Sequence, residues 1–435
     1  MLPLKVAILW HYHQPYYEKD GEFILPWVRL HGVKDYWDLP ELFHEFPNIK
    51  QTINLVPSLS LQIDGYTSHK MIDKIQRLTL LKPIELSQSD KREVLRLFFL
   101  CNEDNMIIPY PGYKELFDKA QDKDIALKTF TEQDWLDLQV WYNLTWFGYF
   151  SRERKYIKRL FKKGKDFTEE EKKLVMDVQL DVMSGITPQL KMLQSLKQVE
   201  ISCTPMYHPI LPLVCDTDSA LEAMPDAALP ELRFKYPEDA KAQIADSLNY
   251  YEKKFGIKPC GMWPSEGSVS NEVLNLMIES GVRWAATDES VLATTMNDIY
   301  EDTMKYFPGK YHSENGDISL LFRDHALSDA IGFVYSRWNP HDAASDFCNR
   351  LTGIRNNLVN KYGDDCLKSA VVPVILDGEN CWEFYRNNGL PFMRAFFEQI
   401  SNSGELKTVT CSEAVSDDEP GFFEANYEYQ GRVVD

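Results

Sequence analysis

Seven short apolar runs recur along this chain, and each leads directly into polar or aromatic residues. They are residues 6–10, 49–56, 199–203, 259–263, 284–287, 319–322 and 370–376. Helical spacing of apolar residues fills much of the sequence between them, as in 237–255, 271–280 and 342–361. Strands that alternate with helices pair in parallel, and strands that are apolar throughout are buried on both faces. The pattern predicts an α/β fold whose parallel strands form a closed or nearly closed barrel.

One long stretch, residues 87–196, lacks such runs. Its apolar residues have helical spacing, most clearly in 93–99 and 174–196. We expect a helical insertion subdomain between the second and third strands of a barrel that spans residues 1–415. Residues 416–435 are acidic and show no periodicity, which predicts a C-terminal tail.

Charge and composition exclude several classes of partner. The chain has 47 Lys and Arg against 66 Asp and Glu, a formal charge of −19, which argues against nucleic acid because phosphate binding needs clustered cations. No apolar stretch is long enough to cross a membrane, and the N-terminus lacks the features of a signal peptide. The eight cysteines are scattered singly, which favours free thiols in the cytoplasm. The oligomeric state is not indicated by the sequence.

Functional side chains of a parallel barrel gather at the carboxyl ends of its strands. The segments that follow the apolar runs are residues 11–15, 204–209, 261–267, 323–325 and 376–380. Polar groups directly after buried strands destabilise the fold unless they are hydrogen-bonded or have a function. Their equivalent positions therefore predict a common pocket.

Two carboxylates in these segments, Glu266 and Asp377, match the needs of glycoside hydrolysis. One carboxyl group must be ionised when it acts at the anomeric carbon, and the other must supply a proton to the leaving oxygen. Glu266 follows Trp263, whose ring offers a face for a sugar, and a shared pocket would partly desolvate Asp377. For either residue taken singly, capping of a following helix is an equally good interpretation.

The His-x-His pair of His11 and His13 has two interpretations. On a strand both side chains lie on the same face, which is metal-ligand geometry. Together with Asp324, Asp377 or His208 they would hold zinc, as in barrel deacetylases and mannosidases. Alternatively, the imidazoles bind sugar hydroxyls, and the spacing alone does not decide. A glycine-rich phosphate loop and a G-x-S-x-G motif are both absent from the sequence, which argues against phosphoryl transfer and serine hydrolysis.

Taken together, the motifs resemble glycoside hydrolase family 57, in its α-amylase and amylopullulanase branch. The resemblance rests on separate motifs in the expected order over nearly the whole chain. They are residues 11–15, 133–141, 204–213, 261–270, 323–336 and 376–382.

This resemblance implies an incomplete (β/α)7 barrel and a retaining, double-displacement mechanism without a catalytic metal or other cofactor. The family's nucleophile maps to Glu266 and its acid/base to Asp377, and retention predicts carboxyl groups about 5 Å apart. The family's histidine pair maps to His11 and His13 in the substrate site. The matching motif positions near the pocket are His208, Trp263, Asp324 and Trp382.

The function we expect is hydrolysis of α-1,4-glucosidic bonds in glycogen, starch fragments or maltodextrins. A 4-α-glucanotransferase is the main alternative, because the same carboxylates support transfer to a sugar. A zinc-dependent carbohydrate deacetylase or mannosidase and a glucan-binding protein without turnover are further alternatives.

The sequence departs from the family pattern in two places. Relatives often carry an aromatic residue in place of Met206, and they commonly continue past the barrel into a helical region, where this sequence has only 416–435.

Overall fold

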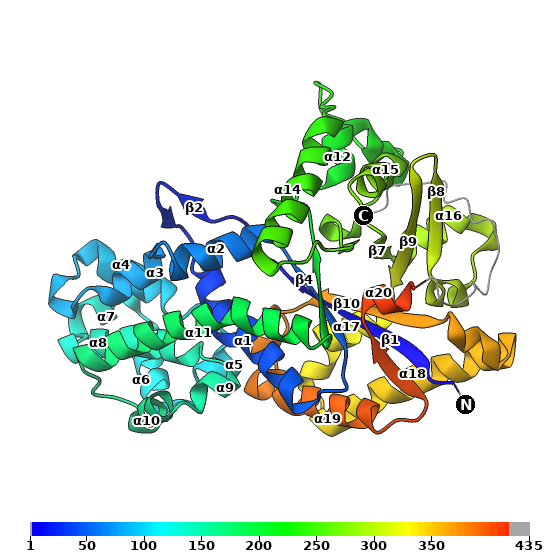
Figure 1. Cartoon of the computed structure of the whole chain (residues 1–435). Coiled ribbons are helices and arrows are strands. Elements are labelled where there is room, and N and C mark those ends of the chain that lie inside the picture. Colours follow the sequence, from blue (N-terminus) through cyan, green and yellow to red (C-terminus); the bar gives the residue numbers. More distant parts are fainter. Residues whose placement is uncertain (1, 417–435) are drawn as a thin grey trace.

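All seven predicted strands form in the computed structural model, which describes residues 2–416. They make one parallel sheet (Figure 1). In spatial order the strands are β10 (Val371–Asp377), β1 (Leu4–Tyr12), β4 (Gln51–Leu55), β5 (Val199–Cys203), β6 (Gly261–Met262), β7 (Trp284–Asp288) and β9 (Gly316–Arg323). The α/β class is therefore confirmed.

The barrel is incomplete, as predicted, because its two end strands do not form a ladder within residues 2–416. Single hydrogen bonds join β9 to β10 instead. The Asp324 amide donates to the Pro373 carbonyl at 2.9 Å, and Arg323 Nε donates to the Ile375 carbonyl at 2.9 Å. These contacts draw the two edges together without closing the ring of paired strands.

Additional strands lack the long apolar run that marks the others. Strand β8 (Gly309–Ser313) pairs antiparallel with β9, and only Tyr311 of it is buried. A small hairpin, β2 (Glu18–Lys19) and β3 (Glu22–Phe23), follows β1. Strand β11 (Leu406–Val409) pairs parallel with the first half of β1, whose second half pairs with β4.

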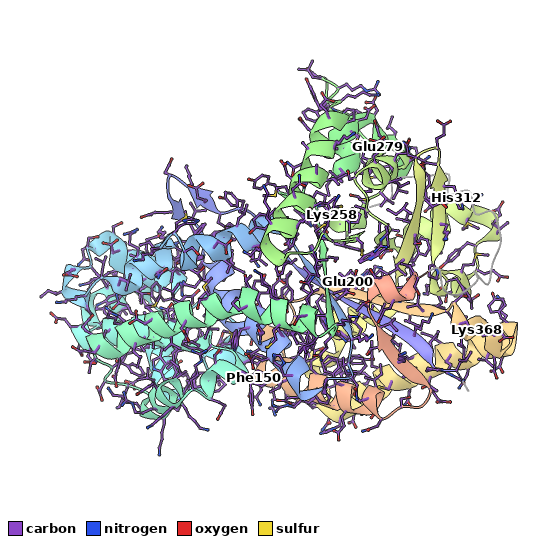
Figure 2. The ribbon with its side chains drawn as sticks, in the orientation of Figure 1. Phe150, Glu200, Lys258, Glu279, His312 and Lys368 are labelled. Atoms are coloured by element: carbon purple, nitrogen blue, oxygen red, sulfur yellow. The ribbon has the colours of Figure 1, made fainter. Side chains whose placement is uncertain are left out.

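A short helix, α20 (Cys411–Ala414), follows β11 and is held against the barrel by Glu200 (Figure 2). The Glu200 carboxylate accepts hydrogen bonds from the Ser412 amide at 2.9 Å, the Ser412 hydroxyl at 2.6 Å and Trp284 Nε1 at 3.1 Å. The predicted tail, 416–435, lies outside the described residues except for Ser416.

Helices alone occupy the described chain between β4 and β5. They begin at Pro57, earlier than the predicted residue 87, and Figure 1 shows them gathered on one side of the sheet. They are α2 (Pro57–Thr67), α3 (Lys74–Leu80), α4 (Gln88–Leu97), α5 (Glu103–Met106), α6 (Pro111–Lys119), α7 (Lys123–Thr129), α8 (Glu132–Thr145), α9 (Tyr149–Arg152), α10 (Lys155–Lys163) and α11 (Glu169–Ser195). The domain boundaries themselves stay a prediction.

A buried polar network joins these helices to α1 (Trp27–Glu45), which packs along α11. Arg29 donates to Asp73 at 2.6 Å and to Asn143 at 2.9 Å, and all three side chains are buried. A buried charge is tolerated only when it is paired and hydrogen-bonded. The network therefore links α1 to the start of α3 and to α8.

The remaining helices cover the barrel. They are α12 (Leu211–Cys215), α13 (Ala220–Ala223), α14 (Pro237–Phe255), α15 (Asn271–Glu279), α16 (Glu289–Met296), α17 (His325–Asp329), α18 (Pro340–Tyr362) and α19 (Leu390–Ser401). Helix α14 has the predicted bounds, because Pro237 starts its first turn and the left-handed Gly256 ends it. Among the described residues no helix is long and apolar enough to span a membrane.

Candidate active site

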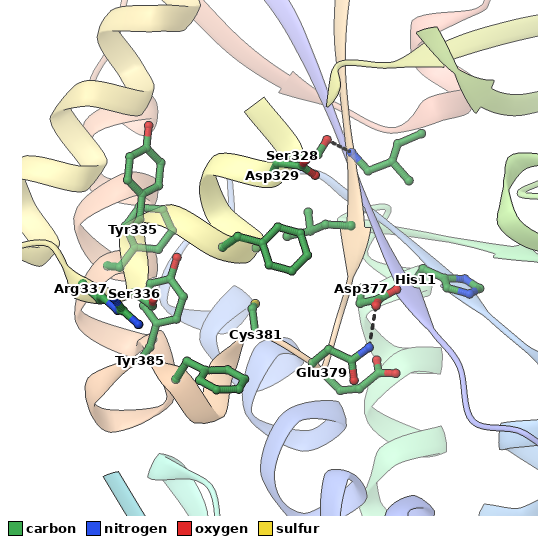
Figure 3. Close-up of a pocket in the computed structure, with 18 of the residues that line it drawn as sticks. His11, Ser328, Asp329, Tyr335, Ser336, Arg337, Asp377, Glu379, Cys381 and Tyr385 are labelled. Atoms are coloured by element: carbon green, nitrogen blue, oxygen red, sulfur yellow. Dashed lines mark hydrogen bonds between the residues drawn. The ribbon is translucent and has the colours of Figure 1, made fainter. Parts of the chain in front are cut away.

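A pocket of about 1430 Å³ lies at the carboxyl ends of the parallel strands (Figure 3). Five of the predicted site residues line it: His11, His13, Trp263, Glu266 and Asp377. The volume exceeds the roughly 300–1,000 Å³ typical of small-molecule sites. The pocket is therefore large enough for several linked sugar rings.

The parallel register explains why these residues meet. His11 at the end of β1 is the partner of Asp377 on β10 and of Asn54 on β4. Residues paired across adjacent parallel strands lie side by side at the same edge of the sheet. The two ends of the chain thus supply neighbouring groups of one site.

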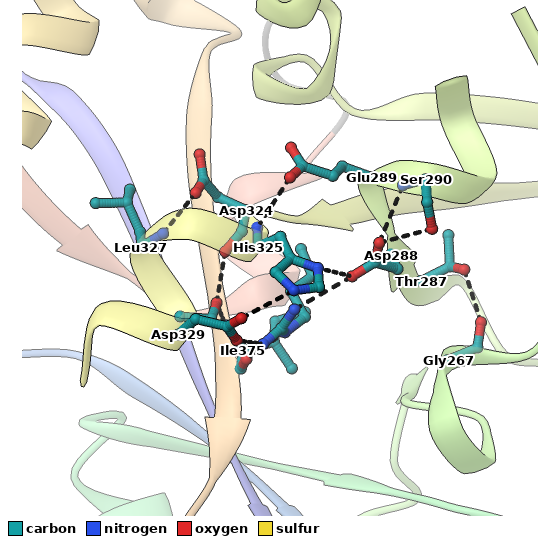
Figure 4. Close-up of polar contacts among 12 residues, drawn as sticks. Gly267, Thr287, Asp288, Glu289, Ser290, Asp324, His325, Leu327, Asp329 and Ile375 are labelled. Atoms are coloured by element: carbon teal, nitrogen blue, oxygen red, sulfur yellow. Dashed lines mark hydrogen bonds and ion pairs between the residues drawn. The ribbon is translucent and has the colours of Figure 1, made fainter. Parts of the chain in front are cut away.

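Glu266 is held in a strained turn directly after β6. Its φ of 56° is left-handed, a conformation costing a residue with a Cβ roughly 1–2 kcal/mol. Gly267 is left-handed too, and a Cβ at this position would lie 2.9 Å from the Trp263 ring. The Thr287 hydroxyl donates to the Gly267 carbonyl at 2.6 Å (Figure 4). Glu266 is the one exposed residue of 261–270, so the turn presents its carboxylate to the pocket.

Asp377 is exposed to the pocket although residues 371–376 before it are buried. Its Oδ2 accepts a hydrogen bond from Asn380 Nδ2 at 2.6 Å. The next residue, Gly378, donates its amide to the His11 carbonyl at 2.9 Å, and a Cβ there would lie 2.2 Å from the Tyr12 ring. The expected desolvation of Asp377 is therefore wrong, because the strand ends at an open cavity.

Asn54 orients the His11 imidazole. Its Nδ2 donates to the Cys203 carbonyl at 2.7 Å, which leaves its Oδ1 to accept from His11 Nδ1 at 2.7 Å. Because Nδ1 carries the proton, the lone pair of His11 is on Nε2.

The other two histidines are stacked on each other and are neutral. The His13 and His208 ring centroids are 3.9 Å apart, with an angle of 18° between planes. Burial, followed by the neighbouring His11, lowers the pKa of His13 to about 3. Burial, followed by His11 and His13, lowers the pKa of His208 to about 2. Neutral imidazoles both donate and accept hydrogen bonds, as sugar hydroxyls do.

The three imidazoles do not fit a zinc ion as they stand. Their nearest nitrogen atoms all lie within 4.8 Å of one another. Zinc binds imidazole nitrogens in the ring plane at about 2.0–2.1 Å. The lone pairs of two stacked rings lie in two separate, nearly parallel planes, so one ring would have to turn before both bound one metal in their ring planes.

The other predicted site residues lie outside the pocket lining. His208 stacks behind His13. Asp324 is buried and caps α17, where it accepts from the Leu327 amide at 2.8 Å, and also from the Tyr306 hydroxyl. Trp382 is buried under its own loop and donates to the Gly378 carbonyl at 2.9 Å. These positions support the loops around the pocket, and direct sugar contacts by these residues stay a prediction.

Sequence reasoning assigned no role to Glu379, although it belongs to the motif around Asp377. It lines the pocket, yet its side chain is buried and its Oε2 has no hydrogen-bond partner within residues 2–416. Burial, and then the charge of Asp377, raise its pKa well above the ordinary value. Burial and the neighbouring Asp377 therefore favour the protonated form of Glu379.

An ion-pair network on β7, β9 and α17 also lines the pocket and was missed (Figure 4). Arg323 lies 3.3 Å from Asp288 and 2.6 Å from Asp329, and His325 Nε2 lies 2.9 Å from Asp329. Burial acts to raise the pKa of Asp288, but hydrogen bonds from Ser290 and Arg323 hold it below its usual value. Strand ends carrying Asp and Arg were visible in the sequence, but their pairing was not.

The helical insertion supplies part of the pocket wall through Asn102, Asp104 and Asn105. Asn105 Nδ2 donates to the Glu383 carbonyl at 2.9 Å, which ties α5 to the loop after β10. Exposed aromatic side chains also line the pocket. They are Phe333 (81% exposed), Phe384 (55%) and Trp338 (44%).

Comparison with known proteins identifies the family of the chain. The model of the family described as Glycosyl hydrolase family 57 matches residues 7–426. The chain belongs to glycosyl hydrolase family 57. No curated protein sequence matches it significantly.

Solved structures share the fold of this family 57 enzyme. The α-amylase AmyC from Thermotoga maritima is 16% identical with a TM-score of 0.57, over 95% of this chain and 74% of that one. The 4-α-glucanotransferase from Thermococcus litoralis is 15% identical with a TM-score of 0.53, over 96% of this chain and 41% of that one. A branching enzyme from Pyrococcus horikoshii is 16% identical with a TM-score of 0.53, over 94% and 69%.

Proposed function

We propose that this family 57 enzyme is a retaining glycosidase that cleaves α-1,4-glucosidic bonds in glycogen, starch fragments or maltodextrins. The observation that carries the proposal is the pair Glu266 and Asp377. Each is an exposed carboxylate that follows a buried strand, and both line one pocket. The free cysteines of the structure support a reducing compartment such as the cytoplasm.

The reaction proceeds in two displacements. Glu266 attacks the anomeric carbon while Asp377 gives its proton to the glycosidic oxygen, so the C–O bond breaks and a glycosyl ester forms on Glu266. Asp377, now ionised, removes a proton from water. The water oxygen bonds to the anomeric carbon, and the ester bond to Glu266 breaks.

The surrounding groups support an oligosaccharide substrate. The Trp263 ring packs against the turn that carries Glu266 and lines the pocket, where it offers a stacking face for a sugar. His13 is neutral over the working pH range, so it binds hydroxyls without adding charge. The large pocket and its exposed aromatic rim suit a chain of glucose units rather than a single one.

Product analysis of maltoheptaose and glycogen digests tests the proposal. The wild type should release shorter maltodextrins with the α configuration. Glu266→Gln and Asp377→Asn should each lower kcat by roughly 10⁴-fold or more. Glu272→Gln is the matched control, because Glu272 is an exposed carboxylate on α15 that does not line the pocket.

Each outcome is informative. Initial β-anomeric products would refute retention, and full activity in either carboxylate variant would refute its role. If maltotriose is disproportionated with little gain of reducing ends, the enzyme is a 4-α-glucanotransferase using the same two residues.

A further inference from the structure

Two arginines that line the pocket have no side-chain partner among residues 2–416. Arg337 and Arg386 line the pocket and are exposed. Within residues 2–416, Arg77 is the only other arginine whose side chain has no hydrogen bond, ion pair or ring contact. In a chain with 66 acidic residues against 47 basic ones, most arginines find a carboxylate. Arg337 and Arg386 differ from these arginines in having no carboxylate partner, and both line the same pocket.

Aromatic packing brings together the two segments that carry these arginines. Arg337 follows Tyr335 closely in the sequence, and Arg386 follows Tyr385 directly. Both tyrosine rings pack on Phe392, with centroid distances of 5.7 Å and 5.8 Å. Figure 3 shows Arg337 beside Tyr385, across the pocket from Asp377 and His11.

The charges that line the pocket therefore differ between its two ends. Its catalytic side carries Glu266 and Asp377, and the Arg323 charge there is paired with Asp288 and Asp329. No lysine lines the pocket in the described structure. Arg337 and Arg386 are thus the only arginine or lysine charges of the lining that no acid compensates.

Exposed rings flank both cations. Phe333 and Trp338 lie near Arg337 in the sequence, Phe384 precedes Arg386, and all three line the pocket. Flat rings stack on sugar faces, and the planar guanidinium fork matches the oxygen atoms of a phosphate. This end combines the chemistry that recognises a sugar with the chemistry that recognises an anion.

We propose that Arg337 and Arg386 form a subsite for a phosphate monoester carried by a glucose unit of the glucan, away from the bond that is cleaved. The proposal rests on the proposed glucan specificity and narrows it to anionic maltodextrins. Neutral maltodextrins remain substrates, because the catalytic carboxylates do not depend on the arginines.

The test compares maltodextrins bearing glucose 6-phosphate units with the same preparation after phosphatase treatment. Calorimetric binding and kcat/KM are both measured at low and high salt. The phosphorylated preparation should bind about tenfold tighter or more at low salt, with a smaller gain at high salt. Maltoheptaonic acid, with one carboxylate at its end, should gain less than the phosphate ester.

Substitution of the two arginines tests whether they cause the preference for the phosphorylated preparation. Arg337→Gln and Arg386→Gln should each reduce the preference for phosphate, and the double variant should abolish it. Arg77→Gln is the matched control, because Arg77 on α3 is also unpaired but lies outside the pocket lining, and it should keep the full preference.

Three results would overturn the inference: no preference for the phosphorylated preparation, a preference that survives in the double variant, or an equal gain for the carboxylate. Its failure is distinct from failure of the proposed function. Cleavage of the dephosphorylated preparation tests the glucan specificity alone, and binding tests the arginines even if no cleavage occurs.

Discussion

Lowering the pH from 7 to 5 should destabilise the folded protein through His13 and His208. Their folded pKa values of about 3 and about 2 lie far below the value near 6.5 of a histidine in an unfolded chain. Between these values the unfolded chain binds more protons than the folded one. Stability therefore rises with pH across this window and is lost as the pH falls.

The magnitude follows from the proton linkage. A histidine that stays neutral when folded, and has a pKa of 6.5 when unfolded, loses about 2 kcal/mol of folding free energy between pH 7 and pH 5. Both histidines are partly buried, so solvent screens part of the effect. Together they account for about 4 kcal/mol as an upper value, a large part of the roughly 5–15 kcal/mol of a typical domain.

The assay is urea unfolding of the wild type and of the double variant His13→Gln/His208→Gln at pH 7, 6 and 5. Carboxylates titrate in both proteins, so their contribution cancels in the comparison. The wild type should lose up to about 4 kcal/mol more than the double variant over this range. His341→Gln, at an exposed position on α18, is the control and should behave as the wild type.

Equal pH dependence of the wild type and the double variant would refute the reasoning. The histidine C2–H resonances give an independent measure. His13 and His208 should show no titration between pH 5 and pH 8, and a midpoint near 6.5 for either ring would show that the stacked pair is not held neutral.

Two further predictions concern the framework of the site. Gly267→Ala should destabilise the protein by about 1–2 kcal/mol and lower kcat, because the left-handed backbone and the Trp263 ring leave no room for a Cβ. The control is Gly353→Ala, in open space on α18, which should be neutral or stabilising by up to about 1 kcal/mol in thermal unfolding. Asn54→Ala should lower the free energy of unfolding by about 1–3 kcal/mol and should lower kcat/KM, because it removes the hydrogen-bond partner of His11. Urea unfolding and initial rates measure the two effects. Unchanged kinetics would show that the His11 tautomer is unimportant.

The strands of the barrel were predictable because burial on both faces leaves a continuous apolar run, as in Val371–Asp377. Strand β8 left no such signal, since it is exposed and only Tyr311 is buried. Strand β11 is short and occupies part of one edge of β1, which local composition does not reveal. Helices begin before residue 87 because Pro57 starts a helix directly after β4, at a position that resembles a strand end in the sequence.

The site was predictable where a motif follows a strand, as at His11, Glu266 and Asp377. What spacing does not show is the direction of each side chain. Asp324 follows β9 as Asp377 follows β10, yet Asp324 caps a helix and Asp377 faces the pocket. The unpaired Arg337 and Arg386 were invisible for a related reason, because the absence of a partner is a property of the folded neighbourhood.

The position of β1 has a consequence for the order in which the enzyme is made. Strand β1 emerges first, but its neighbours β10 and β11 are encoded near the far end of the described chain. At about 5–20 residues per second, the intervening chain takes on the order of 20–70 s to synthesise. During that time the edge of β1 that pairs with β10 has no partner strand, and His11 has no neighbouring Asp377. A nascent chain therefore brings His11 and Asp377 together only once β10 has been synthesised, so the part of the pocket that they line forms late in translation.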